Sequence, residues 1–410
     1  MVIINKILEE YIKLNKELNI NENNKIPLCA AETYISDFCK QPLLSKFEGK
    51  YSFTDSDGQN TFVGGEYVSH LNKLLSEECK LLFGANYTNA DSLTGINCFT
   101  VCAMSLLTQN DHVLLTTPEQ GGHASMPYIL DSLGVSYTEI PYDYNHYQID
   151  YLKLNELCST EKYKFIIFCQ SDIINPPDLN QIQTTDKMGI IYDGTQTLGL
   201  IAGKILPNPL NKKNVILIGG AHKTLPAPSC GLIMTNNLHF AEILSHNITP
   251  HYLRNTQPNH IAALLLCLIE QEDYGHVYQS KTVQLANYLG KSLENYNFQL
   301  AKLNANIYTY THQLFLLMSA EEANDYYIKA QKYNISLNQK HKKLFRNDGI
   351  RLGTQQISRY NWTENEILQL AELLYLLKQE DTNQNKIGNL RNILIEKKIP
   401  QFEYECTVIE

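Results

Sequence analysis

The stretch ILIGGAHKTLPAPSCGLIM, residues 216–234, decides the fold. Apolar runs at 215–218 and 232–234 predict two short buried strands on either side of a turn-rich segment that contains Lys223. An ammonium group between such strands must find a partner, lose its proton or be used covalently, because an unpaired buried charge is costly. Lys223 is therefore either a Schiff-base lysine that holds an aldehyde cofactor or an exposed turn lysine.

A second stretch, MGIIYDGTQTLG at residues 188–199, predicts a strand over 189–192 with Asp193 at its carboxyl end. Ligands of parallel α/β sheets bind at that end of the strands. The pair of Asp193 and Lys223 suits pyridoxal phosphate, because the aspartate keeps the pyridine nitrogen protonated while the lysine forms the imine. The alternative for Asp193 is a helix cap or turn residue, which is common after strands.

Three segments, YDGTQTLGLIAG, LPNPL and HKTLPAPSCGLIM, together resemble the serine hydroxymethyltransferase family of fold-type I pyridoxal-phosphate enzymes. The resemblance runs from about Ile26 to beyond Arg359. Its further anchors are KIPLCAAETYIS, VGGEYV, FGANYTNADSLTG, QGGHASM, IPYD and DGIRLGTQQISR. It implies an α/β fold in which a large domain, with a mainly parallel sheet of the seven-stranded type, is followed by a smaller C-terminal α+β domain.

The length of 410 residues suits two domains that share a core. We expect an N-terminal helical arm over residues 1–25, a large cofactor-binding domain over 26–280 and a small domain over 281–410. The arm is predicted as an amphipathic helix over residues 2–20. In the resembling family such a helix packs on the partner subunit. Its apolar set is Ile4, Ile7, Leu8, Tyr11, Ile12, Leu14 and Leu18.

The net charge of −9 and the lack of a basic cluster argue against nucleic acid or an anionic membrane as partners. The ten cysteines form no CxxC motif, and the closest pair, Cys98 and Cys102, has no histidine beside it. They predict buried thiols in a reducing compartment and no metal site. The N-terminus has neither the apolar run of a signal peptide nor that of a membrane span, so we expect a cytoplasmic enzyme.

The cofactor phosphate is expected at the turn 92–97, which opens a helix over residues 98–107. Its donors there are the Thr94 hydroxyl and the backbone of Gly95 and Ile96. The resemblance adds His222, next to the lysine, as a phosphate contact. It also assigns to Tyr51 the role of reaching the phosphate across a dimer interface, which implies a twofold homodimer with shared sites.

The cofactor ring is expected to contact three polar side chains. In the resembling family the position of His123 stacks on the pyridine; the alternative is a hydrogen-bonded structural histidine. Ser171 aligns with a serine that bonds near the cofactor. Gln196 replaces a histidine that faces the pyridine hydroxyl, and its amide can hydrogen-bond that oxygen but cannot take up a proton there.

The substrate is expected to be an amino acid whose α-carboxylate is gripped bidentately by Arg351, in a predicted strand over 349–353. A structural ion pair is the alternative for this arginine. Two further substrate-binding candidates come from the resemblance. Glu32 lies in AETY, which matches the family's Ser-Glu-Asn-Tyr, with Ala31 in place of the serine. Phe62 replaces one tyrosine of a family pair.

The family's catalytic glutamate has no direct counterpart, because its position falls on Phe53 or Thr54 depending on the count. Glu48 is our first choice as the replacement acid, Asp55 the second, and Asp57 lies nearby. The alternative for each is a solvated loop carboxylate.

These residues predict a pyridoxal-phosphate enzyme of the transferase or lyase type that acts on an amino acid. The first hypothesis is aldol-type chemistry at the Cα–Cβ bond, by a folate-independent aldolase, transaldolase or hydroxymethyltransferase-like enzyme. The second is transamination, racemisation or decarboxylation on the same scaffold. The third is a catalytically dead homologue, against which the retention of Lys223, Asp193 and Arg351 argues.

Overall fold

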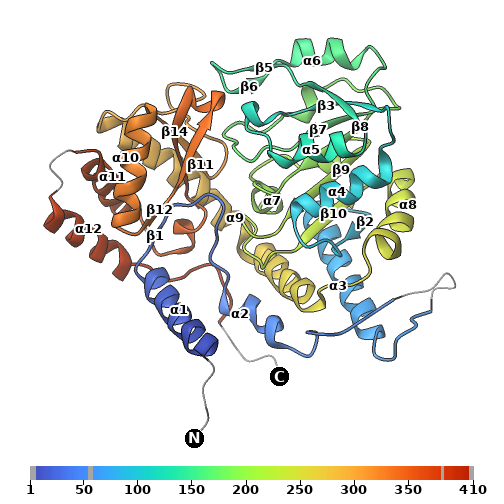
Figure 1. The fold of residues 1–410 in the computed structure, drawn as a ribbon, viewed down its shortest axis with the longest axis horizontal. Helices are drawn as coiled ribbons and strands as arrows, with labels where there is room; N and C mark the ends of the chain where they lie inside the picture. The colour runs from blue at the N-terminus through green and yellow to red at the C-terminus, as the bar shows by residue number, and fades with distance from the viewer. Residues whose placement is uncertain (1–5, 54–58, 380–382, 406–410) are drawn as a thin grey trace, which may run out of the picture.

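The computed structural model describes residues 6–53, 59–379 and 383–405. Its centre is a seven-stranded sheet (Figure 1). In spatial order the strands are β2 (Tyr87–Asn89), β10 (Gly231–Thr235), β9 (Val215–Gly220), β8 (Gly189–Asp193), β7 (Phe165–Phe168), β3 (His112–Leu115) and β4 (Ser136–Glu139). Strand β10 runs in the opposite direction to the other six strands of this sheet. The predicted α/β fold with a mainly parallel sheet is therefore confirmed.

Helices cover both faces of this sheet, as the continuous apolar runs of its central strands require. Alternate strand residues point to opposite sides, so Leu217 packs on one face and Ile216 and Ile218 pack on the other. The first face is covered by α3 (Glu66–Phe83), α6 (Tyr151–Cys158) and α7 (Leu198–Ala202). The second is covered by α4 (Gly95–Leu106), α5 (Ser125–Ser132) and α8 (Leu238–Asn247).

The C-terminal part has its own antiparallel sheet, ordered β11 (Gln313–Leu317), β14 (Asn347–Gly353) and β13 (Asn338–Lys342). Its helices are α10 (Ala320–Lys332), α11 (Glu364–Lys378) and α12 (Gln384–Glu396). The long helix α9 (Pro258–Asn295) links this part to the large sheet (Figure 1). The expected boundary at residue 280 falls inside α9, where Ile261 packs in the large core and Leu289 in the C-terminal one.

The N-terminal segment differs from expectation. Helix α1 (Lys6–Asn23) extends beyond residue 20, and none of its residues is buried. We expected Ile26 to enter the large domain, but Ile26 and Leu28 pack in the C-terminal core. The reason is that β1 (Ile26–Pro27) pairs in parallel with β12 (Ile335–Ser336), whose backbone completes its hydrogen bonds.

Helix α3 begins at Glu66 and ends at Phe83. Its Leu74 is 40% exposed, because it lines an apolar surface cavity between α3 and α9 instead of the core. The remaining short elements are α2 (Asp37–Lys40), β5 (Tyr142–Asp143) and β6 (Gln148–Ile149).

Nine cysteines are free thiols, all buried, and Cys406 lies outside the described residues. Within the described ranges, no helix combines the length and apolarity needed to cross a membrane.

Candidate active site

The carboxyl ends of β8 and β9 form the edge of a cavity of about 210 Å³. Asp193 is the last residue of β8, and Lys223 follows β9, its parallel neighbour, so the two side chains meet at one edge of the sheet. The cavity is lined by Thr94, Gly95, Ile96, His123, Met126, Gln170, Ser171, Asp193, Thr195, Gln196, His222, Lys223 and Ser229. Every expected cofactor-binding residue except Tyr51 is in this set.

The environment of Lys223 favours the neutral form of its amine. Burial and the nearby charge of Arg351 lower the pKa of its amine to about 8, although Asp193 and Asp172 act in the opposite direction. A substantial fraction of the amine is therefore neutral close to physiological pH, as a lysine that attacks an aldehyde must be.

Asp193 offers a carboxylate to the middle of the cavity. Burial raises its pKa, and hydrogen bonds from Thr195 oppose that shift. Both Thr195 donors, the backbone N–H at 2.9 Å and the hydroxyl at 2.5 Å, bind Oδ1. Within the described residues no donor is directed at Oδ2, which can therefore accept a hydrogen bond from a protonated ring nitrogen.

The start of α4 forms one wall of the cavity. Thr94 caps the helix by accepting from Asn97 N at 3.4 Å. A Cβ on Gly95 would lie 2.3 Å from Thr195 Oγ1 and 2.9 Å from Gly220 N, so only glycine lets the helix approach the sheet this closely. Free backbone N–H groups at a helix N-terminus favour a bound phosphate.

His222 supplies a second contact for such a phosphate. Burial, with Lys223 beside it, lowers the pKa of His222 to about 4, so the ring is neutral near pH 7. Its Nδ1 is buried and has no hydrogen-bond partner among the described residues. A buried ring nitrogen of this kind suits a polar ligand atom. The helix start, the orphaned nitrogen, the carboxylate and the neutral lysine fit pyridoxal phosphate.

The ring side of the cavity is formed by His123, Ser171 and Gln196. Burial lowers the pKa of His123, while Asp193 acts to raise it. Gln313 Nε2 donates to Gln196 Oε1 at 2.9 Å and to the Ser171 carbonyl at 3.1 Å. Gln313, on β11, links the C-terminal part to the cavity. Our sequence analysis missed it, although an amide at the head of the apolar strand QLFLL was a usable signal.

Arg351 makes the ion pair that we considered as its alternative role. Its Nη1 donates to Asp172 Oδ1 at 2.7 Å and to the Ser171 carbonyl at 2.8 Å, and its Nη2 donates to Asn338 Oδ1 at 2.9 Å. Its Nε is buried without a partner in the described part of the chain. The guanidinium therefore lies next to the cavity wall with one donor still unused.

Asp172 is the centre of a charge cluster that the sequence analysis did not find. Lys340 and Lys342 bind its two oxygens at 2.9 and 2.8 Å, in addition to Arg351. These cations hold the pKa of the buried Asp172 well below its ordinary value against the effect of burial. A signal was present in the sequence, because Asp172 stands four residues after the apolar run that forms β7 and next to Ser171.

Besides Arg351, four predicted residues do not line the cavity of their own chain. Glu48 is exposed, and the Glu32 carboxylate binds Lys25 at 3.0 Å. Tyr51 packs against Phe62, with ring centroids 4.7 Å apart. Within one chain, the Glu32 carboxylate therefore binds Lys25 and does not line the cavity. The roles of Glu48, Tyr51 and Phe62 stay predictions, and Thr54, Asp55 and Asp57 lie outside the described residues.

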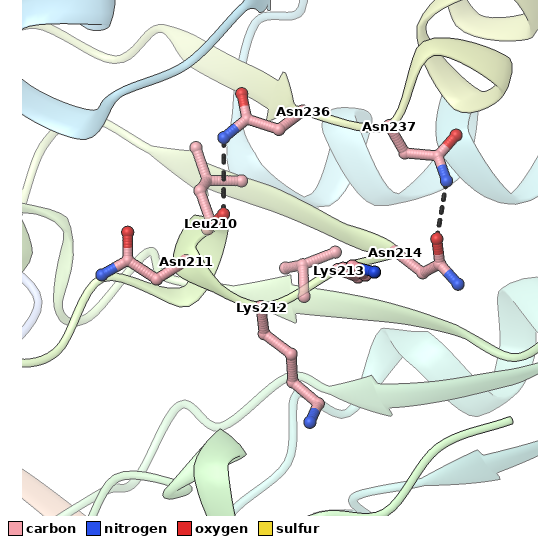
Figure 2. Close-up of a pocket in the computed structure, with 8 residues that line it drawn as sticks. Leu210, Asn211, Lys212, Lys213, Asn214, Asn236 and Asn237 are labelled. Carbon is pink, nitrogen blue, oxygen red and sulfur yellow. Dashed lines mark hydrogen bonds between the residues drawn. The ribbon is translucent and has the colours of Figure 1, made fainter. Parts of the chain in front are cut away.

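A second cavity, of about 240 Å³, lies at the opposite end of β9 (Figure 2). Its lining consists of residues 210–215 with Asn236 and Asn237. Asn237 Nδ2 donates to Asn214 Oδ1 at 2.7 Å, and the Lys212 ammonium donates to the Ile182 carbonyl at 2.8 Å. This lining contains no carboxylate, histidine or cysteine that could act as an acid, base or nucleophile.

Comparison with known proteins agrees with this geometry. A profile of the family described as serine hydroxymethyltransferase matches residues 5–374. The chain belongs to the serine hydroxymethyltransferase family. It is therefore a pyridoxal-phosphate enzyme of the transferase or lyase type, with aldol-type chemistry on an amino acid, as the sequence predicted.

Individual relatives are distant but cover most of the chain. A serine hydroxymethyltransferase from Methanothermobacter thermautotrophicus is 28% identical over 382 residues, 89% of each chain. One from Picrophilus torridus is 27% identical over 386 residues, 91% of this chain and 88% of the relative. The crystal structure of L-threonine transaldolase from Pseudomonas fluorescens superposes with a TM-score of 0.89 over 97% of this chain and 94% of the transaldolase; at 19% identity, this likeness supports the fold alone.

Proposed function

We propose that this enzyme makes or cleaves the Cα–Cβ bond of a β-hydroxy amino acid without folate, as an aldolase or transaldolase. One observation carries the proposal: among the described residues that line the cavity, Asp193 is the single carboxylate. An aspartate committed to the cofactor ring cannot also serve the substrate hydroxyl. At one of the two positions on which the family's glutamate falls, Phe53 packs under the Arg254 guanidinium, which lies 5.0 Å from the ring centroid.

The cofactor, when bound, supplies an electron sink for the bond broken at Cα. The protein's own residues supply the rest. Lys223 holds the aldehyde, and an amine with its lowered pKa can take up and return a proton near neutral pH. Asp193 holds the proton on the ring nitrogen, and the start of α4 with His222 binds the phosphate. The unused Nε of Arg351 orients the α-carboxylate of the substrate.

The test is product analysis on the cofactor-loaded protein. We expect L-threonine to release acetaldehyde, and an added aldehyde to be incorporated with glycine, at rates that tetrahydrofolate does not change. A strict requirement for tetrahydrofolate would overturn the proposal. An oxo acid, a D-amino acid or an amine as the main product would instead support the second hypothesis, of transamination, racemisation or decarboxylation.

The same proposal includes a cytoplasmic homodimer. Helix α1 presents Tyr11, Ile12 and Leu14 to solvent in the single chain, each more than half exposed. An apolar cavity of about 780 Å³ between α3 and α9 is also uncovered. Apolar surface of this extent favours a partner chain. Light scattering should give twice the chain mass, and Ile12→Asp should shift the protein toward monomer; a native monomer would refute this part.

A further inference from the structure

The Asp172 cluster carries more positive charge than its own carboxylate neutralises. Among the described residues, every ion pair of Lys340, Lys342 and Arg351 goes to Asp172. Three cations therefore share one anion. The Asp172 side chain is fully buried, and those of Lys340 and Lys342 are only 18% and 20% exposed. Charges removed this far from water are unfavourable unless an anion compensates them.

The strand pattern places this charge on one face. Lys340 and Lys342 are two residues apart on β13, so their side chains share a face of the C-terminal sheet. Arg351 lies directly opposite Asn338 in the β13–β14 register and shares that face too. The lysines are therefore held in place by the sheet together with Asp172.

This face adjoins the cofactor cavity. Arg351 donates to the Ser171 carbonyl at 2.8 Å, and the Lys342 ammonium reaches the Gly122 carbonyl, next to His123, at 3.4 Å. Ser171 and His123 both line the cavity on its ring side, whereas the expected phosphate contacts come from α4. The charges of Arg351 and Lys340 also act on the Lys223 amine and lower its pKa.

We infer that Lys340 and Lys342 form a subsite for a second anionic group, a carboxylate or phosphate, on the substrate. This inference rests on the proposed function. One negative charge, the α-carboxylate, pairs with Arg351, and the second would meet the two lysines. The enzyme then prefers amino acids or aldehyde acceptors that carry an extra anion over neutral compounds of the same shape.

Two further observations support this assignment. Arg351 Nε has no partner in the described residues although the side chain is only 5% exposed, so the α-carboxylate can bind this donor while Asp172 stays paired in the cluster. Burial lowers the pKa of Lys340 while Asp172 acts to raise it, so the existing carboxylate compensates this ammonium only in part. A second anion beside the two lysines would complete that compensation.

The experiment is a spectral titration of the bound cofactor with matched ligands. One arm compares L-aspartate with L-asparagine and L-glutamate with L-glutamine. The other, with glycine present, compares glyoxylate with glycolaldehyde. We expect the anionic member to bind at least about tenfold tighter in one arm, the size of a charge-assisted hydrogen bond. The responding arm shows whether the amino acid or the carbonyl partner carries the anion.

The variants are Lys340→Gln, Lys342→Gln and the double change, with Lys343→Gln as the matched control. Lys343 follows β13 but lies over the Tyr144 ring, 4.1 Å from its centroid, and outside the cluster. Each single variant leaves Asp172 paired with Arg351 and one lysine, so the fold should persist; thermal melting checks this. The double variant should lose the preference for the anion while glycine binds as before, and Lys343→Gln should retain it.

The outcomes separate the subsite from the proposed function. If glycine perturbs the cofactor spectrum but neither arm discriminates, or if the double variant still discriminates, the subsite is wrong and the proposed function stands. If glycine binding weakens as much as anion binding, the lysines act only by supporting Asp172, and the subsite is again wrong. If no amino acid perturbs the spectrum, the proposed function fails and the subsite fails with it.

Discussion

The two ends of strand β9 carry cavities of similar size but different chemistry. At the amino end, about 240 Å³ is lined largely by asparagine and lysine side chains, several of which bond to one another or to backbone carbonyls (Figure 2). At the carboxyl end, about 210 Å³ is lined by Lys223, Asp193 and His222, whose pKa values are all shifted by burial. Cavity volume therefore does not identify the site, whereas buried groups with shifted pKa values do.

The largest expected contrast is between two lysines at these two ends. Lys223→Ala should abolish the near-visible absorbance of the bound cofactor and reduce turnover by about 10⁴-fold, because no other amine is found among the described residues that line the cavity. Lys213→Ala, at the other cavity, should leave both unchanged. Absorbance and product assays on the two variants measure this. Normal absorbance in Lys223→Ala would place the cofactor elsewhere.

The second contrast concerns Asp193. Asp193→Asn should keep the cofactor bound, since the phosphate contacts at α4 remain, but reduce turnover by about 10²–10⁴-fold, because an amide cannot hold the proton on the ring nitrogen. Steady-state kinetics together with cofactor content after dialysis give the answer. Equal loss of cofactor and activity would mean that Asp193 acts mainly in binding.

The third prediction is a pH profile. The amine of Lys223 has its pKa lowered to about 8, so the neutral fraction grows about fivefold from pH 7 to pH 8 and saturates above about pH 9. The rate at which the apoprotein takes up pyridoxal phosphate, followed by absorbance, should rise in the same way. An ordinary lysine would instead give about a tenfold rise per pH unit that continues through pH 9.

The smallest effect on activity is expected at the amino-end cavity. Asn237 caps α8 by accepting from Phe240 N at 2.9 Å, and its amide donates to Asn214. Asn237→Ala should lower the free energy of unfolding by about 1–2 kcal/mol without changing turnover per folded molecule. Chemical denaturation and kinetics on the same sample test this. A loss of specific activity would show that this end also serves the reaction.

The sequence predicted the secondary structure correctly where buried segments require runs of apolar residues. The apolar runs around Lys223 became β9 and β10, and the strand predicted over residues 189–192 is β8. The positions of Asp193 and Lys223 after such strands predicted that they meet, and the family resemblance added His123; all three line one cavity. Ligand-binding residues of a parallel sheet can be predicted in this way, because they lie at the carboxyl ends of its strands.

The features that the sequence did not predict depend on contacts between segments that are far apart in the chain, and a local sequence pattern does not encode such contacts. Nothing in the run NQKHK indicates that Lys340 and Lys342 bind Asp172, far away in the sequence. Likewise, the role of Gln313 depends on its meeting Gln196 across two sheets. Leu74 fits the helical spacing of core residues but faces a surface cavity. Helical spacing identifies the apolar face of a helix, but it does not say which part of that face another element covers.

The pairing of β1 with β12 has a consequence for how the protein is made. Ile26 finds its strand partner only at Ile335, so the ribosome must extend the chain past that point before the segment behind α1 can be anchored. By then the whole central sheet, which ends in sequence at Thr235, has already been synthesised. The segment behind α1 therefore stays without its strand partner through most of translation.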